Sequence, residues 1–284
     1  MATTVTITGT GTPIARPGLA GPGVLVRHRS TALQFDCGRS TVTRLVEAGL
    51  ALADLSAMFL THHHSDHVVG LADLVMTRWL EDISGDGGPP LAVFAPDGEA
   101  AELAERILAP WEREIRLRAR HSGRTTHPAP NVHRFPATTT PTAVFTGDSV
   151  EVSAVAVHHE PVVPAVGYRI VTPDGAVVVS GDTRVCREIE GLAAGASVLV
   201  HEAFRLEGTQ GLLRDPEALA AYHADTIELG ALAARADVDT LVLTHLIPPL
   251  DAPGDETGFS MDIVRGGFTG TVLVASDLTT VELS

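Results

Sequence analysis

Residues 61–67 read THHHSDH, and this stretch decides how the rest of the chain is interpreted. It follows LSAMFL at residues 55–60, a mostly apolar run that is typical of a buried strand. A strand that ends in imidazoles and a carboxylate places these side chains at a sheet edge, where ligands can enter. Imidazole nitrogen and carboxylate oxygen are ligands that Zn, Fe and Mn accept. The density of such groups favours a metal site over a solvated polar turn.

The spacing within this stretch indicates more than one metal ion. Side chains alternate along an extended chain, so we expect His62 and His64 to point one way and His63 the other. Two ligands that are two residues apart can share one ion. Asp66 and His67 then remain to reach a second ion.

Length and composition describe a globular chain with room for a sizeable core. Its 284 residues are 44% hydrophobic, with a mean hydropathy of +0.18, and no apolar run reaches the roughly 18 residues that a membrane helix needs. The N-terminal MATTVTITGTGTP has no basic segment before an apolar one, so we expect no secretory signal. Cys37 and Cys186, the two cysteines, suit a reducing compartment. We therefore expect a cytoplasmic protein that does not associate with membranes.

The charge balance excludes some functions. The formal net charge is −15, and all 20 basic residues are arginine. An acidic surface repels a phosphate backbone, so extended nucleic-acid binding would require a strong local basic patch. The absence of lysine excludes Schiff-base catalysis.

Further along the chain, other predicted strands also end in ligand-type residues. The two halves of the chain share this pattern of strands and helices, which predicts an α/β fold of two stacked sheets with helices outside. The residues at these strand ends are His158 and His159 after 151–157, Asp182 after 176–179, His201 and Glu202 after 198–200, and His245 after 240–243.

The segment at about 80–150 has a different character. Residues 111–120 read WEREIRLRAR, an amphipathic arginine-rich run, and 121–147 are rich in proline and threonine. We expect this segment to be a variable cap or lid that sets specificity. We interpret its basic face as a solvent-exposed surface in preference to a cap that binds anions. The arginines that could form that face are Arg113, Arg116, Arg120 and Arg124.

Six motifs together resemble the metallo-β-lactamase superfamily, and more narrowly its ribonuclease Z-like branch. The resemblance covers nearly the whole chain and implies one domain over 1–284, with the four-layer αββα fold. Homodimers are common among relatives, so a homodimer is also possible. The motifs are THHHSDH at 61–67, VHHEPVVPAVGYRI at 157–170, SGDTR at 180–184, VHEAF at 200–204, YHADT at 222–226 and LTHL at 243–246.

The resemblance implies two divalent ions, most naturally Zn²⁺ with Mn²⁺ or Fe also compatible, and a bridging hydroxide as nucleophile. His158 is the alternative to His159, which is preferred because it directly precedes the loop leading to Gly167 and Tyr168. The implied ligands are His62, His64 and His159 for one ion, Asp66, His67 and His245 for the other, and Asp182 as the bridge.

The resemblance also implies catalytic residues beyond the metal ligands. His223 would donate a proton to the leaving group or stabilise the developing charge, and Glu202 would orient it. Asp66 would help to position the nucleophile.

One departure from the branch bears on the substrate. Enzymes of the branch that mature tRNA usually carry a long arm between the residues matching His159 and Asp182, and here a strand, turn and strand fill that span. We therefore predict a phosphodiesterase that acts on a small molecule, and an anionic substrate is compatible with this prediction. The alternatives are a lactonase or other ester or thioester hydrolase with Tyr168 or Tyr222 near the substrate oxygen, a tRNA 3′-end endonuclease, a β-lactamase, and a non-catalytic binding module.

Overall fold

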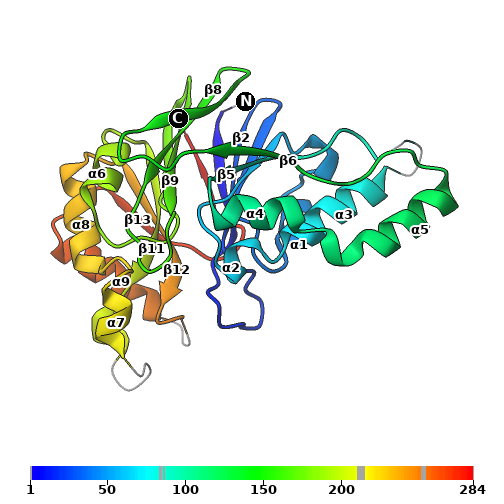
Figure 1. Ribbon diagram of the computed structural model, residues 1–284. Helices are drawn as coiled ribbons and strands as arrows, with labels where there is room; N and C mark the ends of the chain where they lie inside the picture. Colours follow the sequence, from blue (N-terminus) through cyan, green and yellow to red (C-terminus); the bar gives the residue numbers. More distant parts are fainter. Residues whose placement is uncertain (1, 83–84, 86, 210–214, 251–253, 284) are drawn as a thin grey trace.

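Two seven-stranded β-sheets pack face to face in the computed structural model, which describes residues 2–82, 85, 87–209, 215–250 and 254–283 (Figure 1). The first sheet has the order β14 (Thr280–Glu282), β1 (Thr4–Gly9), β2 (Gly23–His28), β3 (Thr31–Phe35), β4 (Ala57–Phe59), β5 (Ala92–Pro96), β6 (Asn131–Phe135). The second has the order β13 (Thr271–Val274), β12 (Thr240–Ile247), β11 (Val198–Phe204), β10 (Gly175–Val179), β9 (Val166–Thr172), β8 (Val150–Ala156), β7 (Thr142–Gly147).

Helices cover the outer face of each sheet, and each helical layer has its own apolar cluster. The first sheet carries α1 (Thr41–Glu47), α3 (Leu71–Glu81) and α4 (Glu99–Arg106), and the second carries α6 (Arg187–Ala193), α8 (Thr226–Arg235) and α9 (Asp255–Arg265). The remaining helices are α2 (Ser65–Val68), α5 (Glu112–Ser122), α7 (Pro216–Ala220), η1 (Leu52–Asp54), η2 (Ala109–Trp111) and η3 (Leu206–Thr209). The predicted four-layer αββα arrangement is confirmed. Among the described helices, none is long and apolar enough to cross a membrane.

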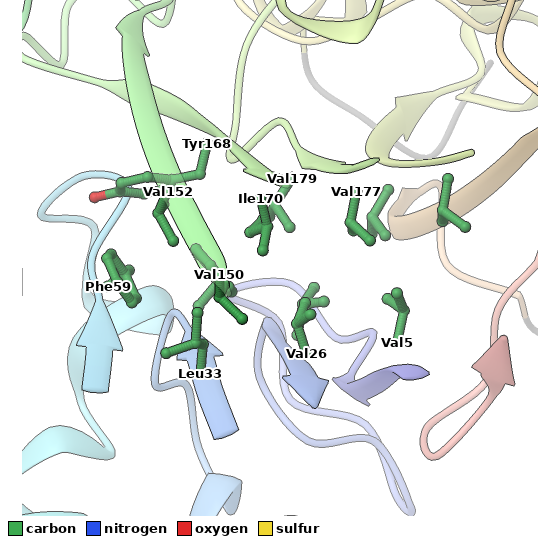
Figure 2. Close-up of a cluster of buried hydrophobic side chains, with 14 of the residues drawn as sticks. Val5, Val26, Leu33, Phe59, Val150, Val152, Tyr168, Ile170, Val177 and Val179 are labelled. Atoms are coloured by element: carbon green, nitrogen blue, oxygen red, sulfur yellow. The ribbon is translucent and has the colours of Figure 1, made fainter. Parts of the chain in front are cut away.

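The core between the sheets follows from side-chain alternation. In β2, Val24 and Val26 belong to the cluster between the sheets, while Leu25 belongs to the cluster under the helices. Such a strand is buried on both faces, which is why it is apolar at successive positions. Figure 2 shows Val26 and Leu33 of the first sheet opposite Val150 and Val152 of the second.

Strand direction brings the ligand-type residues to one place. β3 runs parallel to β4, and β10, β11 and β12 run parallel to one another. The carboxyl ends of parallel strands meet at the same sheet edge, where binding sites form. α2, which follows β4, marks this edge in Figure 1.

Part of the segment at 80–150 belongs to the two sheets and is not a lid. β5 and β6 are paired strands of the first sheet, and β7 pairs with β8 in the second. α5 carries the arginine-rich run and lies at the right-hand end of the molecule, away from α2 (Figure 1). There Arg118 pairs with Glu114 at 2.6 Å, and Arg124 donates to main-chain carbonyls of α3. The expected cap over the site is therefore replaced by core strands and a remote helix.

Candidate metal centre

The THHHSDH stretch adopts two conformations in succession. β4 ends at Phe59, the chain continues extended, and α2 begins at Ser65. His62 is fully buried and His64 half-buried, with ring centroids 4.8 Å apart. Asp66 and His67 lie in the first turn of α2, so the helix and not a strand directs them.

The first cluster combines His62, His64, His159 and Asp182, whose ligand atoms all lie within 4.8 Å of one another. His159 follows β8, and Asp182 follows β10. The His159 Nε2 lies 3.2 Å from the His64 Nδ1 and 3.8 Å from the Asp182 Oδ2. The His62 Nε2 lies 3.9 Å from the same carboxylate oxygen.

The second cluster combines Asp66, His67 and His245. The Asp66 Oδ2 lies 3.4 Å from the His245 Nε2 and 3.7 Å from the His67 Nε2. Asp182 also reaches this cluster, with its Oδ1 3.4 Å from the His67 Nε2 and its Oδ2 3.5 Å from the His245 Nε2. Asp182 therefore borders both clusters.

These separations fit shared coordination of divalent ions. Two ligand atoms that each lie about 2.1 Å from a tetrahedral ion are about 3.4 Å apart. The Nε2 atoms of His62 and His67 are buried and have no hydrogen-bond partner among the described residues. An unpartnered buried nitrogen is costly unless something binds it, and a metal ion meets that need.

Asp36 orients two of these imidazoles and is the residue that sequence reasoning missed. Its Oδ2 accepts hydrogen bonds from the His67 Nδ1 at 2.7 Å and from the Thr61 hydroxyl at 2.8 Å. Because that hydroxyl has donated its proton, it accepts one from the His62 Nδ1 at 2.9 Å. Both rings are thereby fixed with Nε2 free for a metal. An aspartate directly after the apolar strand 31–35 was the available signal.

The protonation states also suit a metal. Burial lowers the pKa of His62 well below its ordinary value and lowers that of His64. Neutral imidazole is the form that coordinates metal ions. Burial also acts against a charged His67, but Asp182 and Asp36 raise its pKa well above the ordinary value. A dication attracted by the same two carboxylates would take the place of that proton.

A β-bulge aims His245 at the cluster. In the pairing of β11 with β12, Glu202 faces Thr244 and Ala203 faces Leu246, so His245 is the extra residue. Its φ of 46° lies in the left-handed region, which non-glycine residues seldom adopt. Bulges redirect side chains beside active sites, and strain of this kind concentrates at such sites.

Comparison with known proteins agrees with this centre. A Beta-lactamase superfamily domain model matches residues 32–246. Ribonuclease Z of Mycobacterium bovis (strain BCG / Pasteur 1173P2) is 37% identical over 281 residues, which cover 98% of this chain and 98% of that protein. The chain belongs to the metallo-β-lactamase superfamily as a ribonuclease Z-like member. It is a metal-dependent hydrolase, and its His and Asp clusters fit divalent metal ions.

Two solved structures share the fold of this ribonuclease Z-like chain. The metallo-β-lactamase fold protein YhfI from Bacillus subtilis superposes with a TM-score of 0.77 at 20% identity, covering 99% of this chain and all of that one. The short form of human tRNase Z superposes with a TM-score of 0.72 at 21% identity, covering 99% of each chain.

The structure separates the two candidates His158 and His159. His159 is 1% exposed, lies in the first cluster and bonds the Tyr222 carbonyl through Nδ1 at 3.1 Å. His158 lies outside that cluster, with its Nε2 3.3 Å from the Glu188 Oε2. The geometry therefore favours His159 as the ligand of this ribonuclease Z-like centre.

Glu202 and His223 form a buried pair beside the clusters. The His223 Nδ1 lies 2.8 Å from the Glu202 Oε1, which also accepts from the main-chain nitrogens of Thr183 and Ala224. Burial lowers the pKa of His223, but Glu202 outweighs this and raises it to about 9. His223 also lies in a ligand-type group with Asp182 and His245, so its ring borders both clusters.

The two tyrosines of the chain occupy different environments. Tyr168 is fully buried between the sheets and donates its hydroxyl to the Leu60 carbonyl at 2.5 Å. It therefore does not line the site, which corrects its suggested place beside a substrate oxygen. Tyr222 is half-buried, with its ring centroid 5.3 Å from that of His159.

Proposed function

We propose that this chain hydrolyses phosphodiesters at a centre that holds two divalent ions, Zn²⁺ by default and Mn²⁺ or Fe as alternatives. The observation that carries the proposal is the position of Asp182, whose carboxylate lies 3.4–3.9 Å from ring nitrogens of both clusters. A carboxylate shared in this way lets two ions lie close together. The proposed ligands are His62, His64 and His159 for one ion, Asp66, His67 and His245 for the other, and Asp182 for both.

The chain's own residues would handle protons and orientation. Bound divalent ions supply Lewis-acid activation of the attacking water and of the phosphoryl oxygens. Asp66 accepts a hydrogen bond from the attacking water and so aims it. His223, held through Nδ1 by Glu202 at 2.8 Å, donates its Nε2 proton to the leaving oxygen.

The preferred substrate is a small phosphodiester. The net charge of −15 opposes binding along an extended phosphate backbone. Only β9, a turn and β10 with their short connections lie between His159 and Asp182, and α5 with its arginines is remote from the site (Figure 1). A compact substrate needs neither an arm nor a basic patch.

Cleavage of RNA near its 3′ end is the second candidate, favoured by full-length similarity to ribonuclease Z. The alignment covers 98% of both chains, so the Mycobacterium bovis protein has a similar length and no room for a long additional arm. The missing arm therefore does not separate this chain from that relative.

A substrate panel on purified, metal-loaded protein tests the function. Its members are bis(p-nitrophenyl) phosphate, a tRNA precursor with a 3′ extension, a lactone, a thioester and a β-lactam. We expect phosphodiester cleavage. Robust lactone turnover without phosphodiester cleavage would overturn the proposal. Cleavage of the tRNA precursor far above that of the small diester would replace the preferred substrate with the second candidate.

Metal analysis tests the dinuclear centre. We expect at least about two ions per chain in protein that has never met a chelator. Fewer than about one ion per chain would contradict the shared role of Asp182.

A further inference from the structure

A third group of ligand-type side chains lies beside the centre, at the start of α6. His158, Cys186 and Glu188 offer a ring nitrogen, a thiol and a carboxylate oxygen within 4.8 Å of one another. The His158 Nε2 lies 3.3 Å from the Glu188 Oε2. We propose that these three residues bind an additional divalent ion that accepts thiolate, such as Zn²⁺, separately from the two ions of the catalytic centre.

Each ligand is oriented by other contacts. Glu160 accepts from the His158 Nδ1 at 3.2 Å, which leaves Nε2 for a metal. The Arg187 Nε donates a hydrogen bond to the Glu188 Oε1 at 3.0 Å, so the Oε2 of Glu188 stays directed at His158. Three ligands with an open fourth position for water satisfy the tetrahedral preference of Zn²⁺.

The group is sheltered but reachable. The Glu188 side chain is 5% exposed, whereas that of His158 is 35% exposed and gives an ion a path from solvent. Cys186 is half-buried, unlike the fully buried Cys37. Because the sequence holds only these two cysteines, Cys186 is the more accessible thiol of the chain.

The position of the group gives the ion a role. His158 directly precedes His159, and Thr183 directly follows Asp182. The two segments already meet, because the Arg184 nitrogen donates to the His158 carbonyl at 3.0 Å and the His158 nitrogen donates to the Thr183 hydroxyl at 3.1 Å. An ion between His158 and Cys186 adds a stronger link between them. It would hold His159 and Asp182 in place and slow the loss of the catalytic ions.

Cobalt substitution tests the site without measuring activity. Metal-free protein is titrated with Co²⁺, and absorption is followed in the near ultraviolet, where cobalt bound to thiolate absorbs strongly. The proposed catalytic ligands are only His and Asp, so they give no such band. We expect the band in the unaltered protein and in Cys37→Ala, and its loss in Cys186→Ser. A band that is absent from the unaltered protein at saturating Co²⁺, or that survives Cys186→Ser, would overturn the proposal.

A histidine variant separates a metal site from a reactive thiol alone. His158→Ala keeps the thiol but removes a ligand, and loss of even an orienting partner weakens metal binding about 10–100-fold. We expect the Co²⁺ concentration at half-maximal near-ultraviolet absorption to rise at least about tenfold. An unchanged titration would show that Cys186 binds cobalt without His158 and would exclude the three-residue site.

The linking role has its own readout. Cobalt in the His and Asp clusters is followed by its visible absorption while a chelator removes it. We expect faster loss in Cys186→Ser than in Cys37→Ala. Equal rates would contradict the link. This inference does not depend on the phosphodiesterase proposal, since a substrate panel that failed would leave the cobalt spectra unchanged.

Discussion

The two halves of the molecule contribute to the centre in different ways. The first half supplies four of the seven proposed ligands from one local run, THHHSDH, where an extended connection passes into α2. The second half supplies His159, Asp182 and His245 from three segments that follow or lie within different strands. The first contribution depends mainly on local conformation. The second depends on strand register across a whole sheet.

This difference predicts which substitutions should affect one metal cluster and which should affect both. In the first half, Asp36 and Thr61 fix the rings of two histidines through hydrogen bonds of 2.7–2.9 Å. In the second half, Asp182 stands between the clusters and touches both. Replacing a ligand from the first half should weaken the binding of one ion, and replacing Asp182 should weaken the binding of both.

The largest expected effect is that of Asp182→Ala. It removes the carboxylate that both clusters share, so both ions should be lost. Lewis-acid assistance is worth several kcal/mol, so turnover should fall by roughly a thousandfold or more. The matched variant His64→Ala should retain more metal, as measured by elemental analysis. Equal metal loss in the two variants would contradict the role of Asp182 as a ligand shared by both clusters.

His223→Ala should lose turnover while keeping its metal content. Removing a general acid costs about 10²–10⁴ in rate. Tyr222→Phe is the control, because it alters the neighbouring side chain and retains the ring. Full activity of His223→Ala in a steady-state assay would rule out its role as proton donor.

The pH profile should report His223 and its partner. Burial disfavours the imidazolium, but Glu202 raises the pKa of His223 to about 9, so the proton is held at neutral pH. Turnover should therefore fall as the pH rises through about 9. Glu202→Gln removes the charge and should move this fall about 1–3 units lower. The measurement is kcat of Glu202→Gln across the neutral to alkaline range. If the fall in kcat stays at the same pH as in the unaltered protein, Glu202 does not set the pKa of the proton donor.

Asp36→Asn should weaken metal binding from outside the ligand set. The variant keeps the size of the side chain but removes the charge that orients His67. Loss of such a partner costs about 10–100-fold in metal affinity. Competition with a chromogenic chelator measures it, and unchanged affinity would show that α2 alone positions His67.

Tyr168→Phe should have the smallest effect on turnover. It removes the hydrogen bond to the Leu60 carbonyl and should cost about 1–3 kcal/mol of unfolding free energy. The free energy comes from urea unfolding, and kcat should match that of the unaltered chain. A large fall in kcat at unchanged stability would place Tyr168 at the substrate after all.

Much of the fold and the centre could be predicted because the signals are local. Apolar runs that end in histidine or aspartate mark strands that stop at one sheet edge, and THHHSDH places four of the proposed ligands within one connection and one helical turn. The alternation in β2 likewise follows from its own residues. Two expectations were wrong: three strands of the two sheets, β5, β6 and β7, lie within the expected lid at 80–150, and Tyr168 is buried in the protein interior. Both outcomes depend on partners far away in the chain.

By itself, then, the sequence determined the type of chemistry, because ligand identity and short-range spacing do not depend on the rest of the fold. Only the tertiary structure decided which ligand-type residues lie in the same cluster. The bulge at His245, the placement of Asp182 between the clusters, and the choice of His159 over His158 all arise from pairing between distant strands. A one-residue change of register reverses the face to which each side chain points, and no local pattern records that register.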